Sequence, residues 1–287
     1  MSSSTPSASQ GWDTHCHVFD PVKHPYISDT PYAPPRRAAE HLMAAVPASN
    51  FVIVMSVPEG TSTAHTLEAI ELLHSAGRKG RGTVVMDPIR MVPDELQKLQ
   101  HAGVRSVRIH TLRIGEDIDV LKTIFEDTAR RIDTAGLKWC IDAQLSLKTW
   151  STLIPTMTKL HGEFGTVFVV DHMFCCSPDD ADNPLLDDLL DLVRRGIMYV
   201  KLSGLDRYSA GKGFEAFGPL VKRLVRADRG GGILFGSDWP HVVMGQGGQL
   251  SEVDTVAHLR FLQDTCESVG EGVWQKVWND NAERLYA

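Results

Sequence analysis

Eight short apolar segments, each followed by a stretch that suits a helix, constrain the fold of this chain more than any other feature. They are apolar on both faces and end in polar residues, as parallel strands do when helices cover both sides of a sheet. The segments comprise residues 12–18, 51–56, 82–86, 106–110, 137–142, 167–172, 198–203 and 233–238. Eight strands that alternate with helices predict a (β/α)₈ TIM barrel.

The stretches between these segments carry the pattern of amphipathic helices. Ile118, Leu121, Phe125, Thr128 and Ile132 recur at steps of three and four, which places them on one helix face. An open, doubly wound sheet is the main alternative, and it would usually carry a glycine-rich phosphate loop after an early strand. The sequence His-Val-Phe-Asp-Pro at 17–21 follows the first strand instead, so the barrel is favoured.

The composition fits one globular unit. Of the 287 residues, 43% are hydrophobic and 23% are charged, which is typical of soluble proteins. We expect a single barrel domain over residues 11–287, after a disordered tail rich in Ser, Thr, Pro and Ala at residues 1–10. A net charge of −7 and a pI near 5.9 argue against a nucleic-acid or anionic-membrane partner.

Two further features bear on where the chain works. No apolar run approaches the roughly 20 residues that cross a bilayer, so we expect no membrane association. The five cysteines are scattered and odd in number, which favours a reducing compartment. The sequence therefore predicts a cytoplasmic protein.

Two histidines stand one residue apart at the end of the first predicted strand. Alternate residues of a strand point to the same side, so His15 and His17 aim both imidazoles into one space. His172 ends the sixth predicted strand and Asp238 ends the eighth, and barrel enzymes carry their chemistry at these strand ends. Because imidazole binds metals and carries protons near neutral pH, the four residues predict a hydrolytic site.

Other polar side chains end neighbouring strands. Arg108 and His110 share one face of the fourth predicted strand, Asp142 ends the fifth, and Arg207 follows the seventh. All four are candidates for the same pocket, where they would contact the substrate.

Each of these candidates also has a structural interpretation. Arg108 can pair with Asp142 or another acid across the barrel, and Arg207 with an acid near it. His110 can bond a backbone carbonyl. His241 follows Asp238 closely, and we assign it either to orienting Asp238 or the substrate, or to a structural role.

Several motifs together resemble the amidohydrolase superfamily. They are Asp-x-His-x-His at 13–17, Asp-His at 171–172 and Gly-Ser-Asp-Trp-Pro-His at 236–241. Residues 15–21, 102–108 and 281–286, with the Pro- and Tyr-rich loop at 24–40, resemble the branch that holds 2-pyrone-4,6-dicarboxylate lactonase and 4-sulfomuconolactone hydrolase. The resemblance runs from about residue 11 to the end, and we expect the loop to lie over the barrel mouth.

This resemblance implies that the chain opens a lactone by attack of water on its carbonyl. It assigns Asp238 as general base, and it assigns His15, His17 and His172 to polarising the carbonyl or to holding a metal ion that does so. One Zn²⁺ on these four residues and a metal-free site are both consistent with the motifs, and no organic cofactor is expected. A binuclear site is disfavoured, because the fourth strand lacks a bridging lysine or glutamate and the fifth lacks a histidine.

The resemblance also points to the substrate. Arg108, Arg113 and Arg207 correspond to anion-binding arginines of the dicarboxylate lactonase, and guanidinium groups bind carboxylates with two parallel hydrogen bonds. A small anionic lactone or carboxylic acid is therefore the expected partner. Asp142 stands where that lactonase has a tyrosine, so we expect a different substrate.

Two alternatives stay open at this point. A nonoxidative decarboxylase of an aromatic or muconate-type acid shares the barrel and the strand-end pattern, but it usually depends on a fifth-strand histidine that this chain lacks. A non-catalytic binding protein derived from the barrel is the other. The presence of Asp238 and both first-strand histidines argues against it.

Overall fold

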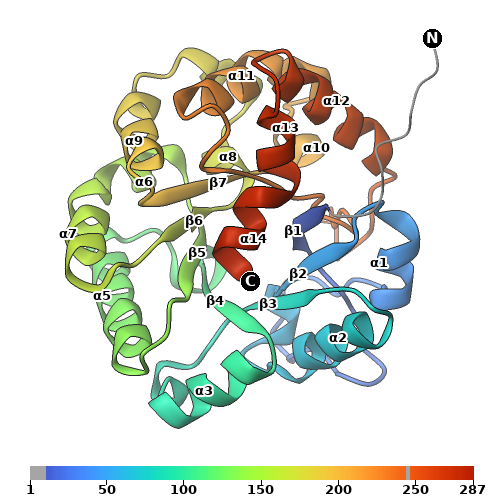
Figure 1. Ribbon diagram of the computed structural model, residues 1–287. Coiled ribbons are helices and arrows are strands. Elements are labelled where there is room, and N and C mark those ends of the chain that lie inside the picture. The colour runs from blue at the N-terminus through green and yellow to red at the C-terminus, as the bar shows by residue number, and fades with distance from the viewer. Residues whose placement is uncertain (1–10, 244–245) are drawn as a thin grey trace.

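Eight parallel strands form a ring in the order of the chain in this computed structural model, which describes residues 11–243 and 246–287 (Figure 1). The strands are β1 (Trp12–Cys16), β2 (Asn50–Val54), β3 (Gly80–Val84), β4 (Val104–His110), β5 (Cys140–Gln144), β6 (Phe168–Val170), β7 (Met198–Leu202) and β8 (Ile233–Phe235). Each strand pairs with the next in parallel. The predicted (β/α)₈ barrel is confirmed, whereas the predicted tail at residues 1–10 lies outside the described residues.

Helices surround the ring and connect its strands (Figure 1). The connecting helices are α1 (Ala39–Ala45), α2 (Ala64–Ser75), α3 (Pro93–His101), α5 (Ile118–Thr134), α6 (Leu147–Thr152), α7 (Ile154–Phe164), α9 (Leu185–Arg194), α11 (Gly218–Ala227) and α12 (Thr255–Glu267). Shorter turns are α4 (Thr111–Ile114), α8 (His172–Cys175), α10 (Leu205–Tyr208) and α13 (Val273–Gln275), and the chain ends with α14 (Asn281–Tyr286). None of the described helices is both long and apolar enough to span a membrane.

Helix α5 shows how the sequence pattern becomes packing. Leu121, Phe125, Thr128 and Ile132 are buried along one face, as their spacing predicts. The side chain of Asp117 caps the first turn by accepting hydrogen bonds from two backbone N–H groups. Burying a side chain such as Phe125 stabilises the fold by about 1.5–3 kcal/mol, so this face fixes the helix against the barrel.

Strand β5 differs from its prediction in a way that matters for the site. It spans Cys140–Gln144 rather than residues 137–142, because its ladder with β4 continues as far as the pair His110 and Gln144. Asp142 therefore lies in the middle of the strand and not at its end. Gln144 occupies the strand end instead.

The ring closes between β1 and the chain just after β8. The backbone N–H of His17 donates to the carbonyl of Trp239, and that of Asp238 donates to the carbonyl of His15, both at 2.8 Å. The carboxylate of Asp13 accepts from the backbone N–H and the hydroxyl of Ser237, at 2.9 and 2.6 Å. These bonds fix the His15 and His17 strand against the segment that carries Asp238.

The opposite end of the barrel is covered by the last helix. Figure 1 shows α14 lying across the centre of the ring. Tyr286 and Asn281 are fully buried there, and the Asn281 amide donates to the carbonyls of Gly230 and Ile233 at 2.6 and 2.7 Å. Arg81 reaches from β3 to the Tyr286 carbonyl at 2.7 Å. The C-terminal strand ends thus remain as the face that presents the site.

Candidate active site

His15 and His17 leave β1 with their rings on the same side, as the alternation predicts. Nδ1 of His17 lies 2.7 Å from the carbonyl oxygen of Val54, and Nδ1 of His15 lies 2.9 Å from Oδ1 of Asp171. A carbonyl or an ionised carboxylate only accepts hydrogen bonds. Nζ of Lys201, which only donates, also lies 3.2 Å from Nδ1 of His15, farther away than the Asp171 oxygen. We therefore assign the proton to Nδ1 in both rings, and both Nε2 atoms then present lone pairs.

His172 begins a left-handed turn directly after β6. Residues 172–175 all have positive φ, at 51°, 52°, 64° and 55°, a conformation that costs a side chain other than glycine about 1–2 kcal/mol per residue. The turn brings Nδ1 of His172 within 2.9 Å of the Ser203 hydroxyl. A Cβ on Gly204 would lie only 2.8 Å from that same Nδ1, so a glycine is required beside the ring.

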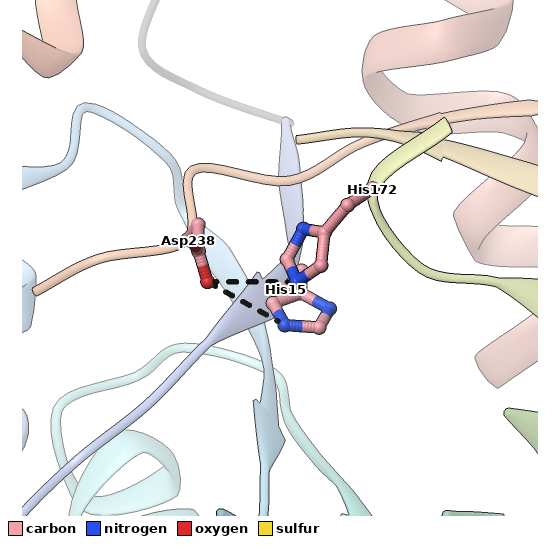
Figure 2. Close-up of side chains that lie close together, drawn as sticks. All are labelled: His15, His172 and Asp238. Atoms are coloured by element: carbon pink, nitrogen blue, oxygen red, sulfur yellow. Dashed lines mark ion pairs between the residues drawn. The ribbon is translucent and has the colours of Figure 1, made fainter. Parts of the chain in front are cut away.

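Asp238 is the point where these side chains meet. Its Oδ1 lies 3.7 Å from Nε2 of His15, 3.5 Å from Nε2 of His17 and 3.9 Å from Nε2 of His172. Figure 2 shows His15, on its strand, and His172, on a turn, both directed at Asp238. Neither Oδ1 of Asp238 nor Nε2 of His15 has a hydrogen-bond partner among the described residues, although both atoms are buried.

This cluster suits a metal ion. Lone pairs of at least two imidazoles face a carboxylate oxygen, an arrangement that is repulsive without a cation or proton between them. The ligand atoms of a tetrahedral zinc lie about 3.4 Å apart, close to the distances observed. His15, His172 and Asp238 form the group of potential ligands whose atoms all lie within 4.8 Å of one another, and His17 lies beside them.

Burial and charge set the protonation of the cluster. Burial lowers the pKa of His15 well below its ordinary value, and it lowers that of His172 to about 4. Burial alone would raise the pKa of Asp238, but the charge of Arg207, together with His172, His17 and His15, holds that pKa well below its usual range. Near neutral pH the site therefore combines the Asp238 carboxylate with neutral rings of His15 and His172.

Two arginines reach the same site from β4 and from the turn after β7. Nη2 of Arg207 donates to Oδ2 of Asp238 at 2.7 Å. Arg108 donates to Asp171 at 3.0 Å and to the carbonyl of Met55 at 2.6 Å, so the ion pair with another acid considered for Arg108 is present. Nε of both arginines is buried and has no hydrogen-bond partner within the described part of the chain.

Two cavities adjoin the cluster. The inner cavity is about 20 Å³, and its lining includes His17, Tyr32, Arg108, His110, His172 and Arg207. The outer cavity is about 570 Å³, and its lining includes Asp206, Arg207, Asp238, His241, Ser251 and His258. Arg207 and Val242 line both cavities. Tyr32 comes from the segment predicted to lie over the barrel mouth.

The remaining predicted site residues take different positions. His110 lines the inner cavity, where burial lowers its pKa to about 2. His241 lines the outer cavity and contacts the Thr255 hydroxyl at 2.9 Å. Asp142 is fully buried and lies 2.5 Å from Nζ of Lys201, beneath the cavities. Arg113 lies in α4, and its side chain is outside the described residues.

Sequence reasoning did not identify Lys201 or assign a role to Asp171. Lys201 lies within the apolar strand β7, and Asp171 accepts hydrogen bonds from both His15 and Arg108. A lysine inside an otherwise apolar strand was the available signal, because such a residue is rarely buried without a charged partner. The identity of that partner follows only from the barrel geometry.

Comparisons with known proteins agree with this geometry. The sequence profile of the amidohydrolase family (Amidohydro_2) matches residues 12–287. The 4-sulfomuconolactone hydrolase of Hydrogenophaga intermedia is 30% identical over 243 residues, covering 80% of this chain and 74% of that protein. The enzyme of the same name from Rhizobium radiobacter is 29% identical over 243 residues, covering 80% and 75%.

Solved structures share the fold at low sequence identity. A probable 2-pyrone-4,6-dicarboxylic acid hydrolase of Acinetobacter baumannii, with citric acid bound, superposes with a TM-score of 0.76 at 18% identity, over 96% of this chain and 99% of that one. A zinc-bound amidohydrolase of Burkholderia multivorans superposes with a TM-score of 0.63 at 16% identity, over 97% and 99%. With its matching profile, its barrel and its strand-end histidines, the chain belongs to the amidohydrolase family.

Proposed function

We propose that this protein is a hydrolase that opens a small carboxylate-bearing lactone. The observation that carries the proposal is the buried, unpartnered Oδ1 of Asp238, which faces Nε2 of His15, His17 and His172 at 3.5–3.9 Å. The relatives named 4-sulfomuconolactone hydrolase support this reaction class.

Asp238 is the general base in this proposal. Its Oδ1 takes a proton from water as the water oxygen bonds to the lactone carbonyl carbon. The ring C–O bond then breaks, and the departing oxygen receives a proton to give a hydroxy acid. The ionised state of Asp238 and the neutral state of His172 near pH 7 support these roles.

The arginines bind the substrate carboxylate in this proposal. Nε of Arg108 and Nε of Arg207 are buried donors without partners in the described structure, and both residues line the inner cavity. An unsatisfied buried donor costs about 1–3 kcal/mol, so an anionic group that accepts from them gains binding energy. His110 and His241 line the two cavities as further substrate contacts, and Arg113 stays a prediction.

We further propose one Zn²⁺ held by His15, His17, His172 and Asp238. A bound zinc supplies a Lewis acid that polarises a carbonyl. The Nδ1 bonds of His15 and His17 orient their Nε2 lone pairs toward that position. The zinc bound by the Burkholderia multivorans amidohydrolase is consistent with this assignment.

The decarboxylase alternative gains no comparable support. The fifth-strand histidine on which it depends has no counterpart in β5, whose polar residues are Asp142 and Gln144. Asp142 is moreover paired with Lys201 beneath the cavities.

The test combines elemental analysis with a hydrolysis assay on the purified protein. 4-Sulfomuconolactone, 2-pyrone-4,6-dicarboxylate and an uncharged lactone serve as substrates, before chelation, after it and after zinc is restored. We expect about one zinc per chain and hydrolysis of an anionic lactone that is lost and regained with the metal. Undiminished hydrolysis without metal would contradict the proposed zinc site and still support the proposed lactonase activity. Carbon dioxide release from an aromatic acid, with no lactone opened, would overturn the proposal.

A further inference from the structure

A buried lysine lies beneath the histidines and takes no part in the chemistry proposed above. Lys201 is in the middle of β7, is fully buried, and lines neither the inner nor the outer cavity as these are described. An ammonium group is costly to bury unless it is paired. Its Nζ lies 2.5 Å from Oδ2 of Asp142, 3.1 Å from Oδ1 of Asp171 and 3.2 Å from Nδ1 of His15.

Asp171 connects this lysine to the site. Its Oδ1 accepts from both Lys201 and Nδ1 of His15, and its Oδ2 accepts from Nη2 of Arg108. Arg108 is itself fixed to the carbonyl of Met55. Two cations, from β4 and β7, therefore hold both oxygens, and the carboxylate keeps Oδ1 directed at the His15 ring.

The orientation of His15 depends on this carboxylate. Nε2 of His15 has no hydrogen-bond partner among the described residues, so Nδ1 supplies the polar contacts that orient the ring. If Asp171 turned, the ring would turn with it, and Nε2 would move away from Asp238.

Lys201, Asp171 and His15 form a relay of polar contacts, and Asp142 is not part of it. Its Oδ2 pairs with Lys201, and its Oδ1 has no partner in the described structure. Removal of the Asp142 charge alone therefore leaves the contacts from Lys201 through Asp171 to His15 in place. Removal of Lys201 breaks them.

We propose that Lys201 is a positioning residue, which fixes the His15 ring through Asp171 and thereby sets how tightly the site binds Zn²⁺. This inference rests on the zinc site of the proposed function. Outer partners of metal-binding histidines typically contribute 10–100-fold to metal affinity.

The experiment compares Zn²⁺ affinity in three variants, measured by competition with a chromophoric chelator. Asp142→Asn keeps the relay, and Asp142→Asn/Lys201→Met removes it without changing the net charge. Lys79→Met/Glu283→Gln removes a remote ion pair of 2.6 Å as a matched control. We expect the double variant at positions 142 and 201 to lose about 10–100-fold in Zn²⁺ affinity, and the other two to bind as the unmodified protein does.

Equal affinity in Asp142→Asn and Asp142→Asn/Lys201→Met would overturn the proposal, because Lys201 would then serve only to neutralise Asp142. Thermal unfolding confirms that the compared variants are folded. An unmodified protein that binds no Zn²⁺ would also overturn the proposal. If the double variant does not fold, ¹⁵N NMR of the histidine rings in the unmodified protein decides. The proposal expects the His15 proton on Nδ1, and a proton on Nε2 would contradict it. Neither measurement uses a substrate, so the outcome is independent of whether the protein opens lactones.

Discussion

Nη2 of Arg207 lies 2.7 Å from Oδ2 of Asp238, so the carboxylate that faces three histidines with one oxygen is held by a guanidinium with the other. The same arginine lines both the inner and the outer cavity. One residue thus contacts the proposed base and both spaces where a ligand can lie. Three of the following predictions concern these two residues.

Asp238→Asn should abolish turnover and leave the fold intact. The amide has nearly the same shape as the carboxylate but cannot accept the proton, and loss of a general base lowers kcat by about 10²–10⁴. Asparagine also tolerates the positive φ of 63° at this position. Steady-state kinetics and a thermal melt check both parts, with the exposed Asp264→Asn on α12 as the matched control. Full activity in Asp238→Asn would show that Asp238 is not the general base.

Arg207→Ala should raise KM for an anionic lactone more than for an uncharged analogue. The substitution removes a guanidinium that lines both cavities and whose buried Nε has no partner in the described structure. A charge-assisted hydrogen bond contributes about 1.5–3 kcal/mol, which corresponds to roughly 10–150-fold in KM. Kinetics with both substrates provide the comparison, and Arg223→Ala on the outer surface is the control. Equal effects on the two substrates would argue against carboxylate binding.

The same variant should shift the acid limb of the pH profile. Burial raises the pKa of Asp238, and Arg207 is the largest influence that lowers it. Without the guanidinium the pKa rises, so the carboxylate takes up a proton at a higher pH as the solution is acidified. The profile of kcat/KM for the uncharged lactone should lose activity at higher pH in Arg207→Ala than in the unmodified protein. An unchanged acid limb would show that Asp238 does not govern it.

Asn281→Asp should destabilise the fold while leaving the shape of the side chain unchanged. The buried amide donates to the carbonyls of Gly230 and Ile233, and a carboxylate would place an acceptor against both. We expect a loss of about 3 kcal/mol in the free energy of unfolding, measured by urea denaturation. Asn279→Asp, whose amide contacts only Asp280 in the described structure, should change it little. A small effect at both positions would mean that the contacts of Asn281 are dispensable.

Much of the fold and the centre of the site could be predicted because their signals are local. Alternation along one strand predicted that His15 and His17 would share a side, and strand-end placement brought His172 and Asp238 to them. Asp142 shows the limit of this reasoning. A strand end two residues later turns a pocket residue into a buried partner of Lys201, and no local pattern reports that shift.

The contacts of Asp171 and the left-handed turn at residues 172–175 could not be predicted from the sequence, for a related reason. Asp171 is held by side chains from β4, β7 and β1, which lie far apart along the chain. The turn contains no glycine, so nothing in its composition indicates positive φ. Tertiary packing imposes both, because the ring of His172 must face Asp238 from the end of β6.

That left-handed turn restricts how this part of the chain can vary. Met173 and Phe174 are fully buried, so replacement by glycine would relax the backbone but leave a void in the core. A β-branched residue would fill the space but is strongly disfavoured at positive φ. All four residues from His172 to Cys175 are unbranched at Cβ, which satisfies both demands. Substitutions here should therefore be accepted mainly among unbranched side chains of similar volume, a restriction that extends to three residues whose side chains perform no chemistry.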